Sequence, residues 1–159
     1  MSVIASILYP VDFSPSCVAM AAYVKRAAAL LGAKVSLVHV VDPTGYNGLQ
    51  LYVRPISEVS DLPIQLDLRE EVLSGARLEA RRRIAELQQM VGTDVPIRVA
   101  VGSVKEALLE AALEADADVL MIGRSHQPGA HGRMRDLTYA MVRDSPFPVL
   151  SVCEGFVSC

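Results

Sequence analysis

VLMIGRSHQPGAHGRMRD, residues 119–136, begins as an apolar run of strand length and continues as a glycine-containing loop rich in cations. The pattern predicts a buried strand over residues 119–122, a turn that opens at Gly123, and a helix further on. A loop between a strand and a helix N-terminus turns backbone N–H groups outward, and the helix dipole favours an anion in front of them. Residues 123–136 are therefore predicted to form a phosphate-type binding loop.

Further apolar runs of strand length alternate along the chain with longer segments of helical period. The other predicted strands are residues 4–9, 34–40, 97–101 and 149–153. Nearly all their residues are apolar, which is typical of strands that are buried on both faces. The alternation predicts an α/β domain in which helices cover both faces of a parallel sheet.

Four helices are expected between these strands, and residues near their ends are typical of helix caps. Ser14 precedes the first helix, which is rich in alanine and ends at Gly32. A stripe of apolar side chains at spacings of three and four predicts a long amphipathic helix that ends at Gly92. The expected helices are residues 15–31, residues 68–91, a third that Ser103 caps and that runs through Ala115, and a fourth that starts at Asp136 or Thr138 and stops before Pro146.

Length and composition favour one domain, residues 1–159. The chain has 52% hydrophobic residues, a net charge of -3 and a pI near 5.6, so it has a core but no charge that would attract nucleic acid or an anionic membrane. Arginines of the long helix alternate with glutamates, which is typical of a solvated helix face. No apolar run approaches the roughly twenty residues that cross a bilayer, and the N-terminus lacks a basic signal region, so we expect a cytoplasmic protein.

Residues 42–63 form a connection that is longer than is typical within a compact domain. The segment contains three prolines and two glycines, and it also carries apolar side chains such as Tyr46, Leu51 and Tyr52. These side chains would be exposed unless they cover something. The segment is interpreted either as a lid over a ligand site or as a surface for a protein partner.

Residues that mark common catalytic or metal sites are missing from the sequence pattern. The three cysteines lack CxxC spacing, and His126 and His131 have no neighbouring set of ligands that would complete a four-ligand metal site. The chain has no nucleophile elbow and no P-loop. We expect neither a catalytic residue nor a bound metal, and we interpret His39, within an apolar strand, as a hydrogen-bonded structural histidine.

Four segments together resemble the universal stress protein family: ILYPVDFSPSC (7–17), LVHVVD (37–42), ADADVLMIGRS (115–125) and SPFPVLSV (145–152). They cover nearly the whole chain in the order and spacing of that family. The resemblance implies a doubly wound five-stranded parallel sheet of order 3-2-1-4-5, with a ligand site at the carboxyl ends of strands one and four. It also implies a homodimer formed by pairing of the last strands, through Pro148, Val149, Leu150, Ser151, Val152 and Cys153.

ATP-binding members of that family wrap the phosphates with a G-x2-G-x9-G-(S/T) motif, which this chain keeps only in part. Gly123 matches the first glycine, and Gly129 matches a further glycine often found inside the loop. The other positions hold His126 at the second glycine, Arg135 or Asp136 at the third, and Asp136 or Leu137 at the hydroxyl position.

These departures weaken a backbone cradle for phosphate, because glycine allows positive φ and close approach of the main chain. Asp136 at a helix N-terminus would itself accept bonds from the free N–H groups and occupy the seat of the triphosphate. Cationic side chains of the same loop are good phosphate ligands and leave nucleotide binding open. These side chains are Arg124, His126, His131, Arg133 and Arg135.

The resemblance places the adenine and ribose near Val11, Asp12, Val40 and Ile122. Core packing alone also accounts for the three apolar residues, and Asp12 alone also fits a turn residue or cap before Ser14. The favoured function is a non-catalytic, dimeric stress-response protein with impaired nucleotide binding. A sensor of ATP or another adenine nucleotide is the alternative, and a slow ATPase is a third. A further protein partner fits the first of these functions.

Overall fold

The computed structural model describes residues 3–43, 62–124 and 132–153, with the backbone alone described for residues 62–69 and 132–136. Five parallel strands form one sheet of order β3-β2-β1-β4-β5, as the resemblance implied. The strands are β1 (Ser6–Pro10), β2 (Lys34–Val41), β3 (Ile97–Val101), β4 (Val119–Arg124) and β5 (Val149–Cys153). The central strand β1 pairs with β2 on one side and with β4 on the other, so the strand order reverses beside β1.

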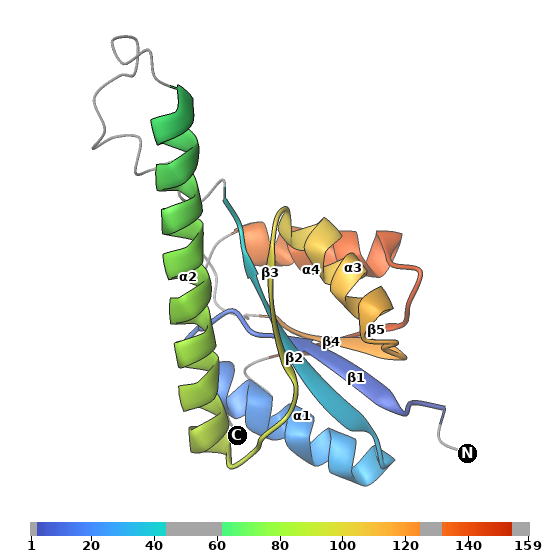
Figure 1. Ribbon diagram of the computed structural model, residues 1–159. Coiled ribbons are helices and arrows are strands. Elements are labelled where there is room, and N and C mark those ends of the chain that lie inside the picture. Colours follow the sequence, from blue (N-terminus) through green and yellow to red (C-terminus); the bar gives the residue numbers. More distant parts are fainter. Residues whose placement is uncertain (1–2, 44–61, 125–131, 154–159) are drawn as a thin grey trace.

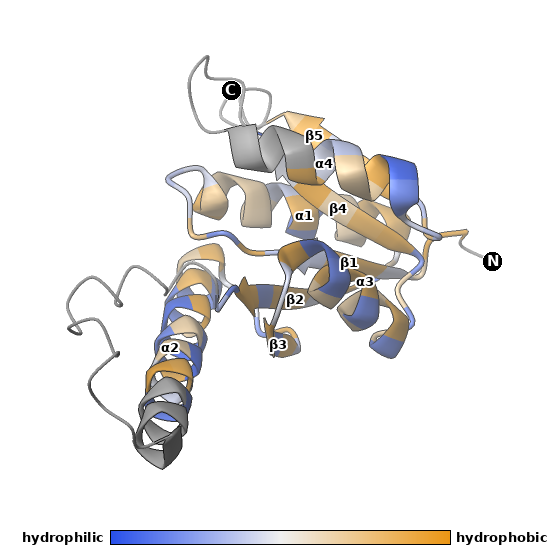
Figure 2. Cartoon of the chain, turned by 90° about the horizontal axis from the view of Figure 1, so that it is seen from above, coloured by the Kyte–Doolittle hydropathy of each residue, from blue (hydrophilic) through white to orange (hydrophobic). Residues whose placement is uncertain are grey.

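Helices cover both faces of this sheet (Figure 1). The helices are α1 (Cys17–Leu31), α2 (Leu62–Val91), α3 (Val104–Glu114) and α4 (Gly132–Asp144). Alternate residues of the strands point to opposite faces: Ile7 and Tyr9 pack with α1 and α2, whereas Leu8 packs with α3 and α4. Two buried layers therefore explain why the strands are apolar at nearly every position, as the hydropathy colouring shows (Figure 2).

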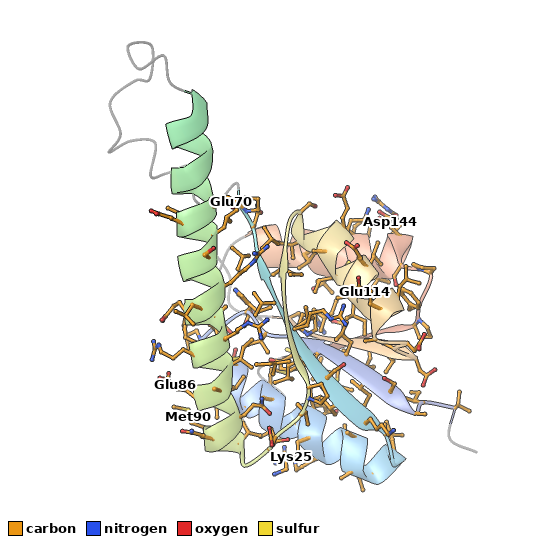
Figure 3. The ribbon with its side chains drawn as sticks, in the orientation of Figure 1. Lys25, Glu70, Glu86, Met90, Glu114 and Asp144 are labelled. Carbon is orange, nitrogen blue, oxygen red and sulfur yellow. The ribbon has the colours of Figure 1, made fainter. Side chains whose placement is uncertain are left out.

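Glycines in the left-handed conformation end the first two helices as the sequence predicts. Gly32 follows α1 with φ +67°, and Gly92 follows α2 with φ +68°. Lys25 of α1 makes two hydrogen bonds at the C-terminal end of α2: its Nζ donates to the carbonyl oxygens of Val91 and Gly92 at 3.1 and 2.8 Å. The C-terminal end of α2 is thus fixed to α1, next to the outward-facing Met90 (Figure 3).

The beginnings of helices differ more from the sequence prediction than their ends do. Helix α1 begins at Cys17 with Ser16 at the N-cap, not at Pro15 after Ser14, because the backbone of Ser14 belongs to the preceding turn. Helix α2 begins at Leu62, which places Pro63 in its first turn, where a missing N–H leaves no bond unmade. The C-terminal half of α2 packs on the core through Ala80, Ile84 and Leu87.

The predicted apolar stripe of α2 is buried over only part of its length. Val72 lies on the expected core-facing side, yet it is exposed, because the first half of the helix extends past the edge of the sheet (Figure 1). Apart from Leu62, Pro63, Asp42 and Pro43, the predicted connecting segment lies outside the described residues. Within the described part of the chain, no helix is both long and apolar enough to span a membrane.

Polar side chains at the amino-terminal edge of the sheet satisfy backbone groups. Oδ2 of Asp118 accepts the N–H groups of Ala5 and Ser6 at 2.8 and 2.9 Å, which holds the start of β1 against β4. The Gln88 side chain bonds both backbone groups of Val95, with Oε1 accepting at 2.6 Å and Nε2 donating at 3.3 Å. Both side chains stabilise the chain at points where a strand begins.

Candidate functional site

A cavity of about 540 Å³ opens at the carboxyl ends of β1, β2 and β4, beside the N-terminus of α3 and the inner face of α4. This is the point where the strand order reverses, which is where open α/β sheets bind ligands. Six residues predicted from the sequence line the cavity together: Val11, Asp12, Val40, Ile122, Gly123 and Leu137.

Among the other predicted loop residues, only Arg124 has a described side chain, and it lies outside this cavity. Arg124 is the last residue of β4, and its side chain is exposed outside the lining. His126, Gly129 and His131 lie outside the described residues, and Arg133, Arg135 and Asp136 lie in α4 where only the backbone is described. The residues that the resemblance places near adenine and ribose therefore line one cavity, and the role of both these residues and the phosphate loop stays a prediction from the sequence.

A larger cavity of about 660 Å³ lies at the opposite edge, where β1, β2 and β3 begin. Its walls come from α1, α2, β2, β3 and the turn before β3, and they mix apolar side chains with charged ones such as Lys34, Asp94 and Arg98. Among the residues that the structure describes, none of the predicted site residues lines it. We assign the candidate site to the smaller cavity, because carboxylates, an imidazole and a helix N-terminus converge there on apolar walls.

Asp12 makes the turn that the sequence offered as one alternative, and its side chain also lines the cavity. Its Oδ1 accepts the N–H of Ser14 at 3.0 Å, which forms a short turn directly after β1. The same side chain lines the cavity and is exposed. A carboxylate has room for several donors, so the turn leaves Asp12 able to accept hydroxyl groups of a ligand.

Phe13 has an unusual backbone conformation beside this carboxylate. Its φ is +56°, in the left-handed region that bulky side chains rarely adopt. The Phe13 ring packs against the His39 ring with centroids 4.5 Å apart, and the guanidinium carbon of Arg83 lies 4.2 Å from the centroid of the Phe13 ring. Three side chains from the β1–α1 loop, β2 and α2 therefore form one stack at the edge of the cavity.

His39 is hydrogen-bonded, as the sequence indicated, and it also lines the cavity. Its Nδ1 lies 2.7 Å from the carbonyl oxygen of Val11, so the Nδ1–H tautomer donates to that oxygen. Burial lowers the pKa of His39, and the charge of Arg83 lowers it further, while the bond to Val11 and the Asp12 charge act in the opposite sense. The imidazole is therefore neutral at neutral pH.

Gly123 does not make the turn that the sequence predicted. It lies inside β4, which continues to Arg124, and its φ is not in the left-handed region. A Cβ at this position would lie 3.2 Å from Cγ and 3.3 Å from Cε of Met20. The missing side chain thus allows α1 to approach β4 closely, directly behind the cavity wall.

Helix α4 starts earlier than the sequence predicted, and Asp136 is not its N-cap. The helix begins at Gly132, so Asp136 is its fifth residue, and its backbone lies beyond the free N–H groups of the first turn. Thr138, the alternative start, is buried inside the helix at 9% exposure. Asp136 and Thr138, which resemble helix caps in the sequence, thus lie within α4.

Sequence reasoning missed the contribution of the β3–α3 connection. Ser103 is the N-cap of α3, and Ser103 and Lys105 line the cavity. Lys105 forms an ion pair with Asp144 at the end of α4, and Arg143 bonds the same carboxylate at 2.6 and 2.8 Å. Arg143 first and Lys105 second hold the pKa of Asp144 well below its usual range. Because the carboxyl ends of parallel strands lie at one edge of a sheet, Ser103, shortly after β3, could have been predicted to lie near the cavity.

Cysteines and metal ligands form no reactive cluster within the described residues. Cys17 is buried, its Sγ lies 4.0 Å from the Tyr9 hydroxyl, and burial followed by the Asp12 charge raises its thiol pKa. Cys153, in β5, forms no disulfide with any cysteine in the described part of the chain. No group of three or more His, Cys, Asp or Glu side chains in the described ranges could hold a metal ion.

Comparison with known proteins gives one family and one fold. The sequence matches the model of the universal stress protein family over residues 4–152. The structure is similar to the universal stress protein UspA from Lactobacillus plantarum, with 20% identity, a TM-score of 0.67, and coverage of 94% of this chain and 97% of that chain. No curated protein sequence gave a significant match.

Two other similar structures contain adenine nucleotides. One is a universal stress protein in complex with cAMP, with 21% identity, a TM-score of 0.56, and coverage of 95% of this chain and 98% of that chain. The other is the universal stress protein from Archaeoglobus fulgidus in complex with dAMP, with 17% identity, a TM-score of 0.51, and coverage of 94% and 98%.

Proposed function

We propose that this chain, which belongs to the universal stress protein family, is a non-catalytic regulatory protein that binds an adenine nucleotide by its base and ribose and holds additional phosphates weakly. The observation that supports this most is the cavity at the switch point, where the Asp12 carboxylate stands beside the apolar walls of Val11 and Ile122. Its volume of about 540 Å³ is suitable for a small molecule.

The residues of the cavity match the chemistry of a nucleoside. Apolar side chains on two sides can enclose a flat purine, and the carboxylate of Asp12 can accept the ribose hydroxyl groups. The similar structures with cAMP and dAMP hold nucleotides that carry one phosphate. They support an adenine nucleotide as the class of ligand.

Weak binding of a triphosphate follows from the substitutions in the glycine motif. His126 and Arg135 or Asp136 stand where ATP-binding members have glycine, and side chains there oppose close approach of the backbone to phosphate. The proposal rests on these missing glycines and not on helix capping by Asp136, which lies in the fifth position of α4.

Calorimetry with AMP, Mg²⁺-ATP and guanosine monophosphate tests this function. We expect AMP and ATP to bind with dissociation constants within about threefold of each other, because a loop that lacks two of its glycines adds little affinity for the two extra phosphates of ATP. Guanosine monophosphate is expected to bind far more weakly. ATP that binds a hundredfold tighter than AMP would refute the impaired phosphate site, and failure of both adenine nucleotides at millimolar concentration would refute nucleotide binding.

Restoring one glycine sharpens the same experiment. His126→Gly is expected to increase affinity for ATP while affinity for AMP stays the same, because only the longer phosphate chain needs the loop. Incubation of both proteins with ATP and measurement of released phosphate tests the non-catalytic part. Steady release above the rate without protein would favour the slow ATPase instead.

We also propose a homodimer through β5, the strand at the edge of the sheet. In the described structure β5 pairs with β4, and Leu150 is 45% exposed. Leu120 donates to the Pro148 carbonyl and is in register with Val149. The alternation of a parallel ladder therefore turns the N–H groups of Val149, Ser151 and Cys153 away from β4, where a second copy can accept them.

Ser151 offers a matched pair of variants for this dimer. Ser151→Pro removes an outward N–H group, whereas Ser151→Ala removes only a buried hydroxyl that has no hydrogen-bond partner among the described residues. Sedimentation is expected to show a dimer for the native chain and the alanine variant and a monomer for the proline variant. A proline variant that stays dimeric while its far-ultraviolet spectrum is native would place the interface on another surface.

A further inference from the structure

A continuous line of contacts joins α2 to the wall of the candidate site. The guanidinium of Arg83 lies over the Phe13 ring, the Phe13 ring packs on His39, and the His39 imidazole donates to the Val11 carbonyl. Val11 in turn donates its N–H to the carbonyl of Val38 at 2.7 Å. Contacts of the Arg83, Phe13 and His39 side chains thus connect helix α2 to Val11, the residue before Asp12.

Phe13 is the link that most needs this support. A bulky residue in the left-handed region has a strained backbone, so surrounding contacts must favour that conformation. The Asp12–Ser14 bond holds the turn on one side. Contacts of the aromatic ring with Arg83 and with His39 hold it on the other.

The position of Arg83 on α2 explains why this arginine makes the contact. It stands three residues after Ala80 and four before Leu87, both of which are buried, so it lies at the border of the core-facing side. The adjacent Arg82 instead pairs with Glu79 at 2.6 Å and with Glu86, which points away from the sheet (Figure 3). Among the described residues, Arg83 has no carboxylate within ion-pair distance, and its guanidinium lies over the Phe13 ring instead.

We propose that Arg83 is a positioning residue of the nucleotide site: by holding the Phe13 ring, it fixes the turn that places Val11 and Asp12 at the ligand. This inference rests on the proposed function, because it assigns a role toward the same ligand. Energetic coupling is reciprocal, so a nucleotide that orders this turn also strengthens the contact with α2. The long helix is thereby linked to occupancy of the cavity.

Calorimetry with AMP on three variants of the full chain tests the proposal. Arg83→Gln is expected to weaken AMP binding about fivefold, because the ring loses its cation. Arg83→Lys keeps a cation over the ring and is expected to stay within about twofold of the native affinity. Arg81→Gln, an equal charge change at an exposed site on the same helix, is the matched control and is expected to bind AMP normally.

A fourth comparison separates positioning from a general effect of charge. In a Phe13→Leu background, the Arg83→Gln change is expected to have no further effect, because the ring through which Arg83 acts is missing. Equal weakening by Arg83→Gln with and without the ring would overturn the proposal, as would native affinity in Arg83→Gln itself. An effect in Arg81→Gln as large as in Arg83→Gln would also overturn it.

NMR spectra of the ligand-free protein test the stack without nucleotide binding, through the signals of the His39 imidazole. If the native chain does not bind AMP, the proposed function fails, and these signals decide the positioning role. Signals that move in Arg83→Gln but not in Arg81→Gln would support a turn held by the stack. Signals that stay unchanged in both variants would overturn it.

Discussion

At the amino-terminal edge of the sheet, the side chains of Asp118 and Gln88 bond the backbone, whereas at the carboxyl-terminal edge Asp12 lines the candidate site. Asp118 accepts two backbone N–H groups, and Gln88 makes two bonds to Val95. Asp12, at the other end of β1, accepts one backbone N–H and faces open space. The same type of residue thus serves stability at one edge and is available to a ligand at the other.

Replacement of Gln88 is expected to have the largest effect on stability. Gln88→Ala leaves the N–H and carbonyl of Val95 without their partner in a region that is part-buried, so we expect a loss of about 2 kcal/mol in the free energy of unfolding. Urea unfolding followed by circular dichroism measures it. Gln89→Ala, at an exposed neighbour, is the control, and an equal effect of both changes would show that the bonds to Val95 contribute nothing.

Asp118→Ala is expected to lower the free energy of unfolding by about 1–2 kcal/mol, because two N–H groups at the start of β1 lose an ionised acceptor. Asp118→Asn retains an acceptor oxygen and is expected to lose about half as much. Neither variant is expected to change AMP affinity when measured well below its melting temperature. A change in affinity would break the division of roles between the two edges.

Asp12→Ala is expected to show the opposite pattern. Affinity for AMP should fall about tenfold, because the carboxylate that we propose accepts the ribose hydroxyl groups is lost, while the free energy of unfolding changes by less than about 1 kcal/mol. Asp12→Asn keeps an oxygen for the Ser14 N–H, so it separates the turn from the charge. Native affinity in the alanine variant would contradict the assignment of the ligand to this cavity.

The smallest expected effect is a pH dependence that comes from His39. Its pKa in the folded protein lies below the ordinary value of 6.5, so the unfolded chain binds a proton first as the pH falls. The stabilisation from the neutral imidazole is therefore complete above pH 6.5 and is lost as the pH falls through the folded pKa. Urea midpoints of the native chain and His39→Gln between pH 7.5 and 5 are expected to converge toward the acid side, and parallel curves would contradict this origin.

Local signals in the sequence predicted the strands and helix ends well, because each depends on nearby residues. The apolar runs of β3 and β5 and the glycines after α1 and α2 are examples. The start of α4 was predicted wrongly, since Asp136 and Thr138 look like caps until burial of Thr138 shows that the helix is already formed there. Burial depends on the tertiary fold, which a local pattern does not contain.

The lining of the candidate cavity could be predicted in part from the sequence. Val11, Asp12 and Ile122 follow from family resemblance and from the shared edge of parallel strands. The stack of Arg83 on Phe13 could not be predicted, because it joins a helix face to a distant turn and depends on a left-handed residue that is not glycine. Lys105 was missed because its position depends on how α3 and α4 pack.

The contact between Gly123 and Met20 constrains how this chain can vary. The Met20 side chain of α1 already fills the space that a side chain at position 123 of β4 would need. A substitution at either of these two positions therefore changes which residues the other tolerates. Alanine at position 123 is best accommodated together with a shorter residue at position 20, and a library that randomises both positions together should recover small–large and large–small combinations. Two residues, Gly123 and Met20, therefore together determine the packing behind the candidate cavity.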